Sequence, residues 1–443
     1  METATPSLRR FRDGDTVVFL GDSITHGGLF HKYLQDFWLT RHPRAAVRFR
    51  NVGVSGDTSA GGLDRIPLAV LPYRPTFVFT MFGMNDHGDG TGIPDQRTPE
   101  QEKRFADRAA AYRKNLGEIV ARLRRETPAP DLAFATGTPY DDRVLIPGSP
   151  VPEKCVGRQD SMHRLAEEAR RLARELEIPV VDFDRTFTAF LHAQQAADPA
   201  YTAIGTDRTH PTANGHLFMA REILAAQGES ALVSSVDLSV APGTPCHAKN
   251  AALSDLDRTG GGLSFTLTEE ALPFPIDPAA ADMAARLRFT DEWSRQSLAV
   301  HGLPAESRMR LSIDGEPIGT WQASDWDRGI NLAEFPTPQA AQARRVAEAS
   351  SEKRSFEERR FCNPYFISLF CQWTGRDPHD DAGLLAEYEK AKDKNDYTMA
   401  MIPTYAEYRD RLSEVPSELD RLDAECRRLA RPVPHRYELR LVP

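Results

Sequence analysis

The first half of the chain alternates short apolar runs with segments of helical periodicity, and this alternation limits the possible folds more than any other feature. Residues 17–20, Val-Val-Phe-Leu, predict a short buried strand. Residues 77–82 form a longer apolar run, which is typical of a strand covered on both faces. Between them, residues 29–40 repeat apolar side chains every four residues, as one face of a helix does. Strands that alternate with helices in this way predict an α/β fold with a parallel sheet between two layers of helices.

The alternation continues to about residue 226. Further strands are predicted at residues 47–52, 132–136 and 179–182, and further helices at residues 100–126, 159–176 and 213–226. In residues 47–52 apolar and polar side chains alternate, which predicts a strand with only one buried face. We assign these elements to a first domain, residues 1–229.

The pattern changes after residue 230, where a small antiparallel β unit is predicted to begin. Residues 308–321 read as a hairpin, because alternating apolar side chains flank an Asp314-Gly315 turn. Residues 336–431 are helical in pattern and heavily charged, and residues 436–442 alternate again as a strand does. We therefore predict a second domain, residues 230–443, in which a long helical insertion precedes a last strand that returns to the β unit.

Composition excludes several classes of protein. The net charge of −9 argues against nucleic acid as a partner, and no apolar stretch is long enough to span a membrane. The five cysteines are odd in number and lack CxxC spacing, so neither a disulfide framework nor a structural zinc site is expected. No apolar segment typical of a secretion signal precedes the first strand, and we expect a cytoplasmic protein.

Polar residues that can do chemistry follow several of the predicted strands. Ser23 follows the first strand, Gly56 and Asn85 follow the next two, and Asp207 and His210 precede the closing helix. The carboxyl ends of parallel strands meet at one edge of a sheet, where open α/β folds bind their ligands. A serine nucleophile needs a base that a third group orients, and its reaction also needs donors for an oxyanion.

Each of these residues also has a purely structural interpretation. Ser23 is a possible helix N-cap, and Gly56 and Asn85 are common turn residues. Asp207 is a possible cap of a short turn, and His210 a possible structural histidine.

Four stretches, in this order, resemble the conserved blocks of the SGNH (GDSL-type) hydrolase family. They are Gly-Asp-Ser-Ile-Thr at 21–25, Gly-Val-Ser-Gly-Asp-Thr at 53–58, Gly-Met-Asn-Asp at 83–86 and Asp-Arg-Thr-His-Pro at 207–211. The resemblance covers about residues 12–227. It implies a three-layer, flavodoxin-like catalytic domain.

The resemblance also implies a role for each candidate residue. Ser23 is the expected nucleophile, His210 the general base and then acid, and Asp207 the acid that orients the imidazole. The backbone N–H groups of Ser23 and Gly56 and the side-chain amide of Asn85 form the expected oxyanion hole.

Neighbouring residues complete the expected site. Asp22 and Asp86 are interpreted as acceptors that fix the loops, while His87 and Tyr140 are weaker candidates for substrate contacts. No metal-ligand cluster, P-loop or dinucleotide-binding glycine motif is found, so no metal or cofactor is expected.

The substrate is predicted less directly than the mechanism. No long apolar lid is present, and the loops near Ser23 and Asn85 carry His, Asp and Gly, which suits a small acyl group on a polar alcohol. The first domain looks most like intracellular carbohydrate acetylesterases such as acetylxylan esterases. We therefore expect a small-molecule or oligosaccharide ester as substrate, and the C-terminal region could support a homo-oligomer. A lipid-directed esterase or thioesterase with the same triad and a non-catalytic binding protein stay open as alternatives.

Overall fold

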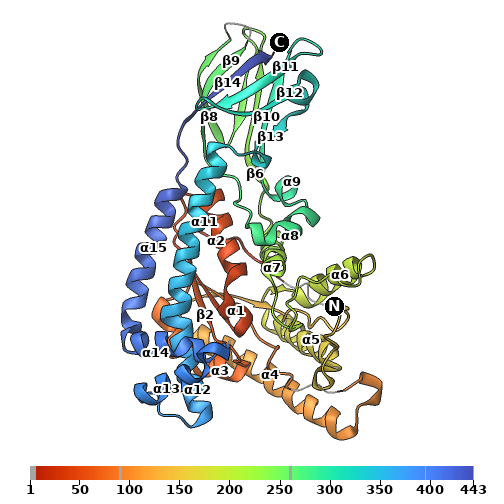
Figure 1. Ribbon diagram of the computed structural model, residues 1–443, viewed down its shortest axis with the longest axis vertical. Coiled ribbons are helices and arrows are strands. Elements are labelled where there is room, and N and C mark those ends of the chain that lie inside the picture. Colours follow the sequence, from red (N-terminus) through yellow and green to blue (C-terminus); the bar gives the residue numbers. More distant parts are fainter. Residues whose placement is uncertain (1–5, 89–91, 259–261, 395, 443) are drawn as a thin grey trace. The chain divides into compact units, whose positions relative to one another are not determined.

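The computed structural model describes residues 6–88, 92–258, 262–394 and 396–442 (Figure 1). The chain divides into two compact units, and each unit combines separate segments. The first unit comprises Met1–Tyr33, Val47–Gly228 and Glu352–Arg421, and the second comprises Leu34–Ala46, Glu229–Ser351 and Leu422–Pro443. The helices of residues 352–421 thus group with the first unit, although they follow the β unit in the chain.

The first unit contains a five-stranded parallel sheet with the order β2-β1-β3-β4-β5. Its strands are β1 (Thr16–Gly21), β2 (Arg48–Gly53), β3 (Phe77–Met81), β4 (Asp131–Ala135) and β5 (Val180–Val181). Helices flank the sheet, as Figure 1 shows. The helices between residues 23 and 226 are α1 (Ser23–Gly27), α2 (Leu29–Arg41), α3 (Ser59–Asp64), α4 (Pro99–Glu126), α5 (Arg158–Leu176), α6 (Phe183–Gln195) and α7 (Ala213–Ala226), and α2 belongs to the second unit from Leu34 onward. The predicted α/β class is confirmed.

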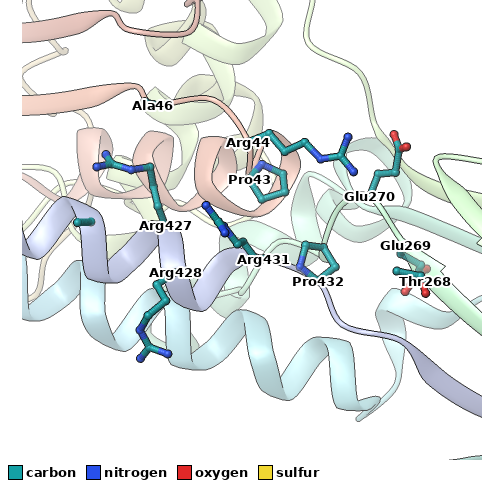
Figure 2. A pocket seen from close by; sticks show the side chains of 11 residues that line it. Pro43, Arg44, Ala46, Thr268, Glu269, Glu270, Arg427, Arg428, Arg431 and Pro432 are labelled. Atoms are coloured by element: carbon teal, nitrogen blue, oxygen red, sulfur yellow. The ribbon is translucent and has the colours of Figure 1, made fainter.

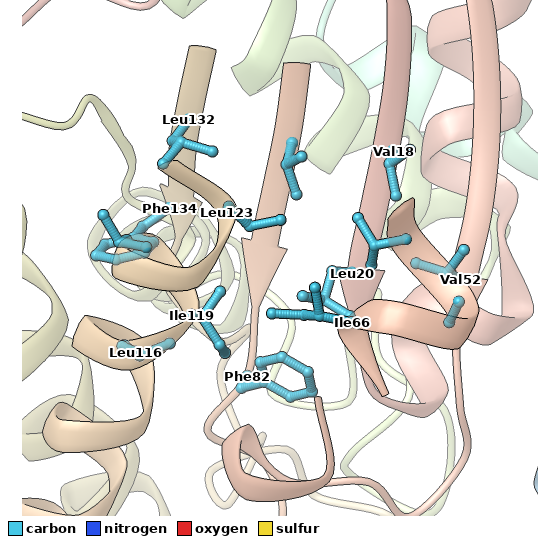
Figure 3. Packing of buried hydrophobic residues seen from close by; sticks show 14 of the residues in the cluster. Val18, Leu20, Val52, Ile66, Phe82, Leu116, Ile119, Leu123, Leu132 and Phe134 are labelled. Carbon is cyan, nitrogen blue, oxygen red and sulfur yellow. The ribbon is translucent and has the colours of Figure 1, made fainter. Parts of the chain in front are cut away.

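The core of the first unit lies between the sheet and helices α4 and α5. Val18 and Leu20 lie on this face of β1, and they meet the apolar stripe of α4, which includes Leu116 and Leu123 (Figure 3). On the opposite face of β1, Phe19 stacks on Phe79 with ring centroids 5.3 Å apart. The sheet is therefore buried on both faces, as continuous apolar strands require.

The strand predicted at residues 47–52 is buried on both sides, so the prediction of a half-buried strand is wrong. Arg50 is 2% exposed and Asn51 is 1% exposed. β2 is an edge strand, and side chains of the helical insertion bind its free backbone groups. Glu357 accepts a hydrogen bond from Asn51 N at 2.8 Å, and Lys353 Nζ donates to the Phe49 carbonyl at 2.7 Å.

The described residues of the helical insertion contain five longer helices. They are α11 (Pro338–Glu357), α12 (Asn363–Thr374), α13 (Asp381–Ala391), α14 (Ile402–Tyr408) and α15 (Val415–Ala430). Ile367, Leu384 and Ile402 of these helices form a small apolar core together with Val54. Because Val54 directly follows β2, this core fixes the insertion to the loop at the end of that strand.

The second unit contains two further sheets, with the orders β13-β10-β6-β7 and β12-β11-β14-β9-β8. Their strands are β6 (Leu232–Ser239), β7 (His247–Lys249), β8 (Ala251–Asp257), β9 (Leu263–Glu269), β10 (Arg295–His301), β11 (Arg308–Ile313), β12 (Glu316–Gln322), β13 (Ile330–Asn331) and β14 (His435–Val442), and the short helices are α8 (Ala281–Arg286), α9 (Phe289–Trp293) and α10 (Ala323–Arg328). The strand pairs described are antiparallel except β6–β10, which is parallel.

Two predictions for this unit are confirmed. Asp314 and Gly315 both have positive φ, 52° and 85°, as a tight hairpin turn between β11 and β12 requires. The last strand, β14, pairs with β9 and β11 and so returns to the β unit after the helical insertion. Within the described ranges, no helix is long and apolar enough to cross a membrane.

The packing of α4 on the sheet leads to a first prediction. Leu123 is fully buried, whereas Leu68 is 71% exposed. Leu123→Ala should lower the free energy of unfolding by about 2–5 kcal/mol, because it removes buried methyl groups and leaves a cavity. The matched change Leu68→Ala should alter it by less than about 0.5 kcal/mol. Urea denaturation of both variants measures the difference, and equal effects would contradict the described core.

Candidate active site

Ser23 stands where β1 gives way to α1. Asp22 is the N-cap of this short helix, and its Oδ1 accepts a hydrogen bond from Ile24 N at 3.0 Å. The capping function therefore belongs to Asp22, which leaves the hydroxyl of Ser23 free for another partner. That partner is His210, whose Nε2 lies 2.8 Å from Ser23 Oγ.

A continuous chain of hydrogen bonds joins Ser23, His210 and Asp207. His210 Nδ1 lies 2.6 Å from Asp207 Oδ2, on the opposite side of the ring from Ser23. The side chains of His210 and Asp207 are 48% and 52% exposed, so the site opens to solvent. The three residues thus have the connectivity of a nucleophile, a base and an orienting acid.

The charges of this chain are set by its hydrogen bonds. Burial opposes ionisation of Asp207, but hydrogen bonds from the side chain and backbone of His210 and from Thr209 N outweigh it and lower the pKa of Asp207 to about 2. The hydrogen bond with Asp207 in turn raises the pKa of His210, while desolvation lowers it. The imidazole is therefore a stronger base than a free histidine side chain.

Arg208 fixes the turn that carries these two residues. Its backbone is left-handed, with φ of 63°, and its side chain is buried on the other side of the turn. The guanidinium donates to the carbonyl oxygens of Asp141 and Val144, each at 3.0 Å, and of Ser149 at 2.6 Å. Sequence reasoning missed this anchor, since a lone arginine inside a motif gives no sign of where its side chain points.

The two other expected oxyanion donors lie at the ends of the strands beside β1. Gly56 follows β2 with φ of 74°, a conformation that glycine adopts without strain. Asn85 follows β3, and its Nδ2 donates to the carbonyl of Asp57, next to Gly56, at 2.8 Å. An amide nitrogen carries two hydrogens, so the second remains for another acceptor.

A buried ion pair holds the loop that carries Gly56. Asp57 Oδ2 accepts from Arg65 Nε at 2.7 Å, and both side chains are 2% exposed. Arg65 also donates to the carbonyl oxygens of Gly21 and Val52 at the ends of β1 and β2. This pair could not be predicted from the motif, because Arg65 lies outside the stretch that contains Asp57.

Asp86 acts as a loop acceptor, as predicted. Its two carboxylate oxygens accept from Ser59 N at 3.0 Å and from Gly83 N at 3.1 Å. Burial raises the pKa of Asp86, and the hydrogen bonds from Ser59 and Gly83 oppose that rise.

The two weaker candidates, His87 and Tyr140, are both buried. His87 Nε2 accepts from Arg158 Nε at 2.6 Å, and burial together with this arginine lowers the pKa of His87 to about 3. Arg158 also lies over the ring of Tyr140, 5.2 Å from its centroid. His87 and Tyr140 therefore pack behind Arg158 and do not present their polar atoms to solvent. Arg158 itself is half-buried, and its charge lowers the pKa of His210 slightly.

His26 links three parts of the site, although no motif marks it. Its Nδ1 accepts from Ser55 N at 3.2 Å and lies 3.0 Å from Ser55 Oγ. Its Nε2 lies 2.9 Å from Asn363 Oδ1 in helix α12. Burial lowers the pKa of His26 to about 4, so the ring is neutral and connects α1, the Gly56 loop and the helical insertion.

A separate cavity of about 770 Å³ lies within the second unit, and its chemistry is different. Arg44, Arg427 and Arg431 line it together with Glu270 (Figure 2). It contains no serine–histidine pair. Across the described ranges of the chain, no group of three or more His, Cys, Asp or Glu residues is placed to hold a metal ion.

Part of the chain is similar in sequence to known proteins. Residues 19–217 match the sequence profile of the GDSL-like lipase/acylhydrolase family. Over these residues the chain is similar to that family. The protein is accordingly a carboxylic ester hydrolase.

One curated protein and two solved structures are similar to this chain. An acetylxylan esterase from Geobacillus stearothermophilus is 26% identical over 234 residues, which cover 48% of this chain and 94% of that protein. The structure of a gut microbial diltiazem-metabolizing enzyme matches 99% of this chain and 100% of its own, with a TM-score of 0.86 and 26% identity. The structure of the Geobacillus stearothermophilus acetylxylan esterase covers 49% of this chain and 96% of its own, with 21% identity and a TM-score of 0.38.

The raised pKa of His210 leads to a second prediction. In a proton NMR titration, His210 should titrate above the ordinary value of about 6.5, because ionised Asp207 stabilises the imidazolium. Asp207→Asn removes that charge and should lower the pKa of His210. His26 serves as an internal control, since it should stay neutral until the pH falls to about 4. A pKa of His210 that is the same in both proteins would contradict the described pair.

Proposed function

We propose that this esterase removes short acyl groups, acetyl above all, from carbohydrates, with Ser23 as nucleophile, His210 as general base and Asp207 as the orienting acid. The observation that carries the proposal is the hydrogen-bond chain from Asp207 Oδ2 to His210 and on to Ser23 Oγ, with distances of 2.6 Å and 2.8 Å. A hydroxyl is a weak nucleophile by itself, and a base at hydrogen-bond distance is the group that activates it.

In the acylation step, Ser23 Oγ attacks the ester carbonyl carbon while its proton passes to His210 Nε2. Ionised Asp207 stabilises the imidazolium that forms and holds the ring with Nε2 toward the serine. The tetrahedral intermediate then expels the alcohol, which takes the proton from His210, and an acyl-serine remains.

The negative oxygen of the intermediate needs donors that are already in place. We assign this role to the backbone N–H groups of Ser23 and Gly56 and to the side-chain amide of Asn85. Asn85 donates one hydrogen to the Asp57 carbonyl, which orients the amide, and offers the other to the oxyanion. Deacylation repeats the steps with water: His210 removes its proton, the oxygen attacks the acyl carbon, and the carboxylic acid leaves as Ser23 regains its proton.

Two lines of support favour a small acyl group. His210 and Asp207 are about half exposed, so the site is open to solvent, which suits a small acyl group on a polar alcohol. A relative described above is named as an acetylxylan esterase, and acetylxylan carries acetyl esters on a sugar chain. We further propose a cytoplasmic enzyme that acts on small-molecule or oligosaccharide esters, with no nucleic acid or membrane partner and with homo-oligomer contacts through the C-terminal region.

The nucleophile is tested with p-nitrophenyl esters from acetate to octanoate. Wild-type activity should be highest on acetate, and Ser23→Ala should remove it while the circular dichroism spectrum stays the same. Activity that survives in Ser23→Ala would contradict the triad. A preference for longer acyl chains would favour a lipid or thioester substrate on the same triad, and no activity on any ester would favour a binding protein.

The oxyanion assignment gives a separate prediction. Asn85→Ala should lower kcat on the order of 10²–10³-fold, the usual effect of removing one oxyanion donor. Asn115→Ala is a matched control, since that amide donates to Ser59 Oγ beside the same loop and lies outside the proposed oxyanion hole. A similar loss of kcat in both variants would show that Asn85 acts only through the loop structure.

A further inference from the structure

A cavity of about 600 Å³ lies beside the loop that carries Gly56, and the three residues of the proposed triad do not line it. The loop and helix α3 form one wall through Gly56, Thr58 and Asp64, and helix α12 of the insertion forms the other through Gln372 and Trp373. All of these residues belong to the first unit. A ligand in this cavity would therefore lie directly next to one proposed oxyanion donor.

Trp373 lies at the end of this cavity nearest the donor. A Cβ placed on Gly56 would be only 3.8 Å from Cζ3 of the indole, so the ring and the glycine backbone are close neighbours. The indole packs edge-on against buried Phe366, with centroids 6.5 Å apart, yet 54% of Trp373 is exposed. One side of the indole thus packs against the protein while the rest is exposed to solvent, an arrangement in which a large aromatic side chain can contact a ligand.

Tyr397 extends the same aromatic surface. It is 57% exposed, its ring lies 6.3 Å from that of Phe366, and its hydroxyl lies 3.1 Å from Ser55 Oγ. Trp373 and Tyr397 thus flank one buried ring, and each contacts the loop that carries Gly56. The helical insertion thereby adds to the site an aromatic surface that the conserved motifs do not contain.

The other lining groups show what kind of ligand fits. Thr58, Asp64 and Gln372 offer a hydroxyl, a carboxylate and an amide, and the described residues provide no hydrogen-bond partner for these side chains. Arg65 also lines the cavity, but its guanidinium is engaged by Asp57 and by backbone carbonyls. Among the described residues that line it, the cavity therefore has no free cation for an anionic ligand, and it carries too many polar groups for an alkyl chain.

We propose that this cavity is a subsite for the alcohol portion of the substrate and takes a sugar ring. The apolar C–H face of the ring stacks on Trp373, and its hydroxyl groups bond to Asp64 and Gln372. The inference rests on the proposed function, because it assumes that the ester carbonyl is held at Gly56 and Ser23. Under this proposal, specificity for the alcohol portion of the substrate comes from the helical insertion and not from the catalytic motifs.

The test compares a ring-bearing substrate with one that lacks a ring. The ratio of kcat/KM for acetylated xylobiose to that for ethyl acetate is measured in the wild type and in Trp373→Ala. This ratio should fall about tenfold in the variant, mainly through KM, because the stacked ring loses its apolar contact. Trp373→Phe should recover part of the loss. Leu385→Ala, which removes another exposed apolar side chain of the insertion, is the control and should keep the wild-type ratio.

Two kinetic outcomes would overturn the subsite. An equal fall on both esters would show that Trp373 only supports the Gly56 loop, and an unchanged ratio would show that the ring does not touch it. A binding measurement separates the subsite from the chemistry. Calorimetric titration of xylotetraose into Ser23→Ala should give a dissociation constant that rises about tenfold when Trp373→Ala is added, whether or not the triad is correct. Equal binding by the two proteins would also overturn the proposal.

Discussion

The site depends above all on the parallel pairing of β1 with its neighbours β2 and β3. Gly21 at the end of β1 lies opposite Gly53 of β2 and Met81 of β3, so three strands deliver their following loops to one place. Close contact at this edge requires glycine: a Cβ on Gly53 would lie 2.2 Å from His26 N in helix α1. Without that glycine, α1 could not pack against the end of β2, and Ser23 would not stand beside the loop that follows β2.

The helical insertion completes this edge from a distant part of the sequence. Glu357 and Lys353 bind the free edge of β2, and Asn363 binds His26, which in turn holds Ser55. An edge strand with unsatisfied backbone groups would otherwise be open to water or to another strand. The insertion therefore stabilises the same loop that it provides with an aromatic surface. Changes in the insertion can thus affect both the position of Gly56 and the choice of alcohol, which is why the experiments above separate the two effects.

We could predict from the sequence the α/β class, most of the strands and helices, and the contacts among Ser23, His210 and Asp207. Each of these depends on a local pattern or on a motif. The burial of β2 could not be predicted, since Arg50 and Asn51 look like the polar face of an ordinary half-buried strand. Each has a partner more than three hundred residues away in the chain: Arg50 bonds Asp420, and Asn51 N bonds Glu357. The linking role of His26 was missed for the same reason, and so was the buried pair of Asp57 with Arg65. Helix α6 was also missed, because its short apolar pattern directly follows the two-residue strand β5.

The two aspartates near His210 show how environment separates similar groups. Asp22 is buried beside Ser23, and burial raises its pKa to about 7, against the effect of one backbone hydrogen bond and the attraction of His210. Asp207 is about half exposed and accepts hydrogen bonds from one imidazole and two backbone N–H groups, so its pKa falls to about 2. Carboxyl groups whose pKa values are pushed apart in this way take different roles. At neutral pH Asp207 is fully ionised and supplies the charge that faces the imidazole, whereas Asp22 serves the helix it caps. The sequence places one aspartate next to the serine and another three residues before the histidine, and this spacing does not distinguish their charges. The burial of each carboxylate and the number of donors around it do.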